Sequence, residues 1–183
     1  MKVIITGFEP FGGSDRNASW EAVRLIPNAE KILLPVTFDG AARQIREIVR
    51  SGPDAVICVG EAGGRNAVSL ERIAVNLADA RIPDNEGRQP TDQPVRADGP
   101  AAYFTGLPVK RILERIREKE IPAELSCTAG TYVCNTVFYS LMDEIALSGL
   151  PVKGGFIHVP AAGMPPETAA DAIMTAISET CGL

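Results

Sequence analysis

Short apolar runs rich in Val and Ile alternate along the chain with stretches in which apolar residues recur at helical spacing. Residues 55–59 form a continuous apolar run, which is typical of a central strand covered on both faces. Residues 40–50 carry Ala41, Ile45 and Ile48 at a spacing that predicts a helix. The same patterns predict further strands at residues 3–6, 31–35, 69–77, 125–127 and 155–159, and further helices at residues 18–25, 109–119, 132–147 and 167–180.

This near-regular alternation of strand and helix predicts an α/β fold, a single three-layer α/β/α catalytic domain over residues 1–183 with a mostly parallel, partly mixed central sheet. Functional sites in such sheets form beyond the carboxyl ends of the strands. The candidate loops are therefore residues 7–17, 60–65 and 128–131, and the turn that follows His158. The long polar segment 79–99 is expected to be irregular, and such segments inside compact domains are often functional.

Composition narrows the class of protein. Hydrophobic residues make up 45% of the 183 residues and the net charge is −5, which argues against nucleic acid or an anionic membrane as a partner. We expect a cytoplasmic protein, because no apolar run approaches the length of a membrane span and the N-terminus resembles a first strand more than a signal peptide. The four cysteines are far apart and the chain has one histidine, so free thiols are expected and a zinc site is not.

Two side chains can supply nucleophilic chemistry. Cys134 falls in the first turn of the predicted helix 132–147, where free N–H groups and the helix dipole are expected to lower the thiol pKa and to bind an oxyanion. The alternative for any free cysteine is plain burial, and it suits Cys58 and Cys127. His158, the sole histidine, ends a predicted strand at the same sheet edge and is the only imidazole available as a base.

A third group should orient the imidazole. The candidates are Glu71, Asp79, Asn76 and Asp84, and spacing alone does not choose among them. The glycine-rich loops 7–13 and 60–65 match neither phosphate-binding nor dinucleotide-binding motifs. Each alone is typical of a structural turn, but together they predict a pocket in which backbone approaches a small ligand. Phe8 and Phe11, placed in one of these loops, are expected to form its wall rather than the core.

The motifs together resemble the pyroglutamyl peptidase I family, also called pyrrolidone-carboxylate peptidase. The resemblance is carried, in the family's order and over nearly the whole chain, by TGFEPFGG at residues 6–13, VGEAGGR at 59–65, ERIAVN at 71–76, ARIPDN at 80–85, TAGTYVCN at 128–135 and GGFIHVP at 154–160.

The resemblance implies a Cys-His-Glu triad of Cys134, His158 and Glu71, with Arg81 beside the nucleophile as support for the oxyanion. It implies a substrate pocket made of Phe8, Phe11, Asn17, Glu61, Ile82, Tyr132 and Val133. The implied reaction is the removal of an N-terminal pyroglutamyl residue from peptides by acyl transfer, without metal or cofactor. A homo-oligomer, dimer or tetramer, is also implied.

One departure bears on specificity, because the family commonly has glutamine where this chain has Glu61. A carboxylate that points at the ring would change recognition, whereas one that points away would change little. Two alternatives therefore stand beside the first hypothesis: a cysteine hydrolase of another small amide, and a non-catalytic module that binds a small cyclic amide on the same scaffold.

Overall fold

A computed structural model describes residues 1–182 of the chain. Its elements are β1 (Val3–Phe8), α1 (Ala18–Val23), β2 (Glu30–Leu34), α2 (Phe38–Arg50), β3 (Ala55–Ala62), β4 (Val68–Glu71), β5 (Ile73–Val75), β6 (Ala102–Phe104), α3 (Val109–Glu118), β7 (Ala123–Ser126), α4 (Val133–Ser148), β8 (Lys153–Pro160) and α5 (Pro166–Cys181).

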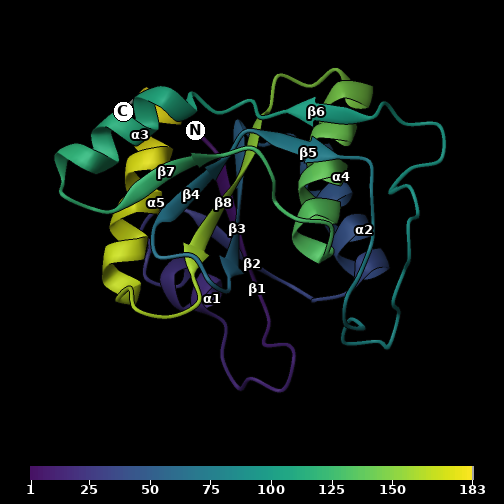
Figure 1. The fold of residues 1–183 in the computed structure, drawn as a ribbon. Coiled ribbons are helices and arrows are strands. Elements are labelled where there is room, and N and C mark those ends of the chain that lie inside the picture. Colours follow the sequence, from purple (N-terminus) through teal and green to yellow (C-terminus); the bar gives the residue numbers. More distant parts are fainter. Residues whose placement is uncertain (183) are drawn as a thin grey trace.

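The main sheet has the strand order β2-β1-β3-β8-β4-β7 within the described residues. All neighbouring strands run parallel except β4 and β8, which pair antiparallel. Helices α2 and α4 lie on one side of the sheet, and α1, α3 and α5 lie on the other (Figure 1). The predicted fold class, a layered α/β fold with a mostly parallel, mixed sheet, is confirmed.

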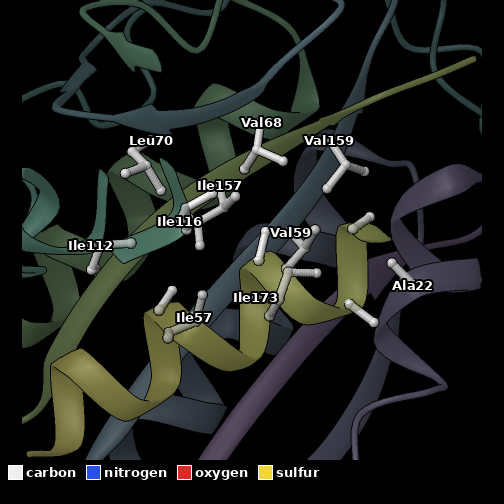
Figure 2. Close-up of a cluster of buried hydrophobic side chains, with 14 of the residues drawn as sticks. Ala22, Ile57, Val59, Val68, Leu70, Ile112, Ile116, Ile157, Val159 and Ile173 are labelled. Carbon is white, nitrogen blue, oxygen red and sulfur yellow. The ribbon is translucent and has the colours of Figure 1, made fainter. Parts of the chain in front are cut away.

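Successive residues of a strand point to opposite faces of the sheet, and this alternation divides the core in two. Ile57 and Val59 of β3 and Ile157 of β8 point toward α5, where they pack with Ile173 (Figure 2). Their even-numbered neighbours, including Cys58 and Phe156, belong to the second cluster under α2 and α4. Chemistry on β8 is therefore confined to one face, because the other is filled with aliphatic side chains.

The prediction of a single strand over residues 69–77 is wrong. The chain leaves the main sheet at Arg72, and β5 pairs instead with β6, an element that the sequence did not predict. The backbone of Arg72 explains the break, because its N–H donates to the carbonyl of Ser126 and its carbonyl accepts from the N–H of Thr105. Alternation of side chains indicates a strand but does not indicate which sheet the strand joins.

The segment 76–101, which joins β5 to β6, is irregular as predicted and is fastened to α4. Asp143 of α4, almost fully buried, accepts hydrogen bonds from Tyr103 (2.7 Å) and Arg96 (3.0 Å). Tyr139 of the same helix donates to the carbonyl of Pro100. None of the helices in residues 1–182 is long and apolar enough to cross a membrane.

Candidate active site

Cys134 lies in the first turn of α4, as the sequence predicted, and is the second residue of the helix. The N-terminal cap, Tyr132, makes no side-chain hydrogen bond to the helix, and the first carbonyl that receives a helical bond is that of Tyr132, from the N–H of Thr136. The N–H groups of Val133, Cys134 and Asn135 therefore have no partner within the helix. They are available as donors beside the sulfur.

The sulfur rests on the main sheet at Gly60 of β3. A Cβ atom at this position would lie 2.9 Å from the Sγ of Cys134 and 2.9 Å from the ring of Phe156, which is closer than side chains tolerate. The glycine of the 60–65 loop is thus needed for the approach of the thiol. Asn135 fixes the helix start, since its side chain accepts from the N–H of Val75 and donates to the carbonyls of Val75 and Leu77.

His158 lies on β8 directly beside Gly60. Its side chain is on the same face of the sheet as Cys134, which packs over Gly60. Paired strands are about 4.8 Å apart, and thiol and imidazole line the same cavity. The Nδ1 of His158 is 2.8 Å from the Oε1 of Glu71. Because an ionised carboxylate only accepts hydrogen bonds, we assign the ring proton to Nδ1, which leaves Nε2 as the acceptor.

Glu71 is fully buried at the end of β4, on the strand that pairs antiparallel with β8. Ser69 is the direct partner of His158 in this register, and Glu71 is its diagonal neighbour on the same face, within reach of a long side chain. Of the four carboxylate and amide candidates from the sequence, Glu71 is the one that contacts the imidazole.

The other three candidates lie in the segment 76–101 and do not contact the imidazole. Asp84 is buried but accepts the N–H groups of Phe38, Glu86 and Arg88, so it closes a turn and holds the start of α2. Asn76 bonds to the backbone of the same segment. Asp79 is exposed at the cavity.

The cavity at Cys134 and His158 has a volume of about 480 Å³. Its rim includes Arg81 and Ile82, both of which are exposed. The side chain of Arg81 makes no hydrogen bond or ion pair to any of the residues 1–182, so its guanidinium is available to a ligand. Arg65 also lines the cavity, but its guanidinium is held by Glu71 and by the carbonyl of Thr128.

A narrow apolar cleft of about 20 Å³ adjoins the larger cavity, with which it shares Cys134, Phe11, Glu61 and Tyr132. Its walls contain all but one of the seven predicted pocket residues, together with Val36, which the sequence analysis missed: Phe8, Phe11, Asn17, Val36, Glu61, Tyr132, Val133 and Cys134. The remaining predicted residue, Ile82, lies at the larger cavity. Phe8 lines the cleft, as predicted, but it also belongs to the buried hydrophobic cluster under α2 and α4.

Polar residues of the loops hold the walls of this cleft in place. The Oε1 of Glu9 accepts the N–H of Val36 at 3.0 Å and the side-chain amide of Asn85 at 2.8 Å. The hydroxyl of Tyr132 donates to the carbonyl of Pro83, and its ring packs against Phe11. No sequence pattern predicts a positioning role for Glu9 or Asn85, because no spacing along the chain relates residues 76 positions apart.

The side chain of Glu61 points toward α1. Its Oε2 accepts the N–H of Ala18 at 2.7 Å, which is expected because odd-numbered residues of β3 face the α1 side. Asn17 caps the same helix start by accepting the N–H of Ser19, and its amide nitrogen donates to the carbonyl of Glu9. Glu61 therefore lines the cleft and also fixes the start of α1.

The predicted lowering of the Cys134 pKa is wrong. Burial raises the pKa of this thiol to about 12, and the carboxylates of Glu71 and Glu61 act in the same direction. Arg65 acts against them, as the free N–H groups of the helix start do in principle. The free site therefore holds a neutral thiol, because the desolvation of the sulfur outweighs the effect of the helix terminus.

Comparison with known proteins identifies the family of this chain. A family model described as pyroglutamyl peptidase matches residues 1–180. This chain belongs to the pyroglutamyl peptidase family. It is accordingly a cysteine peptidase.

Curated relatives named pyrrolidone-carboxylate peptidase come from archaea and bacteria. The Thermococcus kodakarensis protein is 52% identical over 167 residues, which cover 87% of this chain and 81% of the relative. The Bacillus subtilis protein is 51% identical over 169 residues, which cover 87% of this chain and 78% of the relative.

The solved structures of the family give the same result for the fold. The crystal structure of Bacillus amyloliquefaciens pyroglutamyl peptidase I superimposes with a TM-score of 0.95 at 44% identity, covering 100% of this chain and 97% of that one. The E192A mutant of Pyrococcus furiosus pyrrolidone carboxyl peptidase superimposes with a TM-score of 0.93 at 39% identity, covering 100% of this chain and 99% of that one.

Proposed function

We propose that this pyroglutamyl peptidase family member removes N-terminal pyroglutamate from peptides by acyl transfer through Cys134, His158 and Glu71. The observation that carries the proposal is the chain of contacts at one sheet edge. The thiol lies over Gly60, the imidazole lies on the neighbouring strand, and the imidazole bonds at 2.8 Å to a buried carboxylate. This is the nucleophile, base and orienting group that acyl transfer requires.

Because the thiol is neutral at rest, the sulfur loses its proton as it attacks. The Nε2 of His158 takes this proton while the Cys134 sulfur bonds to the pyroglutamyl carbonyl carbon. Glu71 stabilises the imidazolium that forms. The imidazolium then protonates the leaving amine, the thioester remains on Cys134, and a water molecule deprotonated by His158 releases pyroglutamate and restores the thiol.

The negative charge that develops on the carbonyl oxygen has two sets of donors nearby. The unpaired N–H groups at the start of α4 are directed to the sulfur side of the helix end. Arg81, free of protein partners among residues 1–182, supplies a cation at the cavity rim. We assign Arg81 to support of the oxyanion and the helix start to its direct binding.

The cleft beside Cys134 suits a small neutral ring. Phe8, Phe11 and Tyr132 offer aromatic surface to the lactam faces. An uncyclised N-terminal residue would bring an ammonium, whose desolvation among these walls is costly. The cleft is narrow, about 20 Å³, so the proposal includes a shift of the half-buried Phe11 ring as substrate enters.

The direct test is an assay of the purified protein on matched pyroglutamyl, prolyl and glutaminyl chromogenic amides. The proposal predicts hydrolysis of the pyroglutamyl amide alone, with preference over the other two by at least about a hundredfold, as expected where desolvation or lost hydrogen bonds exclude the analogue. Faster hydrolysis of another amide would favour the hydrolase alternative, and tight lactam binding without turnover would favour the binding module.

We also retain two expectations from the resemblance and the composition, a cytoplasmic protein and a homo-oligomer, dimer or tetramer. Sedimentation of the purified protein tests the second, since a monomer at assay concentration would contradict it.

A further inference from the structure

Arg65, in the turn between β3 and β4, bonds to the same carboxylate oxygen as the imidazole. Its Nη1 lies 2.6 Å from the Oε1 of Glu71, which also receives the Nδ1 proton of His158. Its Nη2 donates to the carbonyl of Thr128 at 2.8 Å. The side chain is mostly buried. The guanidinium thus joins the triad carboxylate to the loop that leads into α4.

The charges of these groups decide where the protons reside. Glu71 is fully buried and its Oε2 has no hydrogen-bond partner among residues 1–182. A carboxylate so placed, with imidazole as its only partner, would be stabilised by drawing a proton onto the ring. A protonated ring is useless as a base for the neutral thiol. A permanently charged guanidinium on the same oxygen removes that demand, because it neutralises the carboxylate by itself.

We propose that Arg65 is a positioning residue for this site: it keeps Glu71 ionised and oriented while leaving His158 neutral, so that the ring can accept the proton of Cys134. This proposal rests on the proposed function of the same triad. The resting site then contains a thiol, a neutral imidazole and a Glu71–Arg65 ion pair.

Other charged groups face the imidazole and the thiol and must be considered with Arg65. Glu61 of β3 and Glu71 of β4 act on the sulfur from two strands. Asp79 and Arg81 line the same cavity from the segment 76–101. Of these residues, Arg65 is the one bonded to the carboxylate that holds the ring, so its removal should change the protonation of both reacting groups.

The sign of the change follows from the lost positive charge. Without it, the protonated His158 ring and the neutral Cys134 thiol are both favoured, and the pKa of the thiol rises further because Arg65 lowers it in the native protein. The reaction begins from a neutral ring, so the acid limb of kcat/KM moves to higher pH. The expected shift for Arg65→Gln is about one pH unit.

The experiment measures pH profiles of kcat/KM for the wild type, Arg65→Gln, Arg65→Lys and Arg72→Gln. Arg65→Lys keeps the cation but loses the two-pronged contact, so it should lower kcat and leave the acid limb near that of the wild type. Arg72→Gln is the matched control, because it removes an arginine one residue from Glu71 whose side chain reaches the exposed Cys127 instead. Its profile should match the wild type.

A lower rate in Arg65→Gln with an unshifted acid limb would overturn the proposal and leave Arg65 a purely structural residue. If Arg65→Gln does not fold, the test rests on Arg65→Lys. An acid limb of kcat/KM that is shifted in Arg65→Lys would also overturn the proposal. A second readout needs no pyroglutamyl substrate: iodoacetamide labelling of Cys134 at fixed pH should be several-fold slower in Arg65→Gln than in Arg72→Gln. Equal labelling rates contradict the Arg65 proposal, whereas absent amide turnover in the wild type contradicts only the proposed function.

Discussion

The two faces of the main sheet are built from the same strands but held together by different forces. The face under α1, α3 and α5 is filled by aliphatic side chains such as Ile57, Ile157 and Ile173. The face under α2 and α4 also buries polar groups, among them Asn135, Asp143 and Glu144 of α4. These bond respectively to the backbone of β5, to Arg96 and Tyr103, and to Arg50 of α2.

The difference teaches where stability and precision come from. Apolar packing is not directional, so the aliphatic face can hold the sheet without fixing any one atom. Hydrogen bonds are directional, and the polar contacts of α4 fix the helix start that carries Cys134 and the segment that carries Arg81. Two neighbouring residues of β8 illustrate the difference between the faces. Ile157 packs in the aliphatic cluster, whereas His158 lines the cavity with Cys134.

The largest expected effect is that of His158→Gln. Glutamine keeps a polar side chain of similar length but cannot take up and return a proton at neutral pH, so kcat/KM on a pyroglutamyl amide should fall by about 10²–10⁴. Thermal unfolding should remain within a few degrees of the wild type. Activity near that of the wild type would show that the imidazole is not the base.

Its neighbour should show the opposite pattern. Ile157→Ala opens a cavity in the aliphatic face and should lower the free energy of unfolding by about 2–5 kcal/mol. At a temperature where the variant remains folded, its kcat/KM should stay within about twofold of the wild type. Urea unfolding followed by assay checks both, and a large kinetic loss in the folded variant would mean that the two faces are not separable.

Asn135→Ala should affect both quantities, because it belongs to the polar face. The change leaves the N–H and carbonyl of Val75 and the carbonyl of Leu77 without their partner. We expect a loss of about 1–3 kcal/mol in unfolding free energy. The loss of kcat relative to the loss of unfolding free energy should be larger than in Ile157→Ala, because the helix start that carries Cys134 is no longer fixed to β5. If this ratio is the same in Asn135→Ala and Ile157→Ala, the two faces of the sheet do not differ in their effect on the site.

The smallest effect is expected for Glu61→Gln. The amide oxygen of glutamine can still accept the N–H of Ala18, so binding of the pyroglutamyl ring should change by less than about threefold. The lost negative charge should lower the pKa of the Cys134 thiol, because the carboxylate raises it in the native protein. Iodoacetamide should therefore label this variant somewhat faster at fixed pH, and slower labelling would contradict the sign.

The sequence carried much of the fold because its periodicities are local. The continuous apolar run at residues 55–59 and the helical spacing at residues 40–50 each predicted an element that is present. The break at Arg72 was missed because it depends on backbone bonds to Ser126 and Thr105. Those partners lie far along the chain, and no local pattern refers to them.

The site likewise contains features that local sequence patterns predict and features that they do not. The positions of Cys134 at a helix start and of His158 near a strand end follow from local patterns, and the choice of Glu71 came from resemblance alone. Arg65 was missed because it looked like part of a glycine-rich turn, and its partner is six residues away in a strand that runs back beside the site. The pKa of Cys134 was predicted in the wrong direction because burial is a property of the folded chain.

The central claim is that the Cys134 sulfur carries the pyroglutamyl group during turnover. Rapid quenching of the wild-type protein with excess pyroglutamyl ester, followed by intact mass and peptide mapping, tests it directly. The account predicts a mass increase of one pyroglutamyl group on the peptide that contains Cys134, absent in Cys134→Ser and removed by hydroxylamine. Turnover in the wild type with no acyl adduct, or an adduct on Cys58 or Cys127, would contradict it.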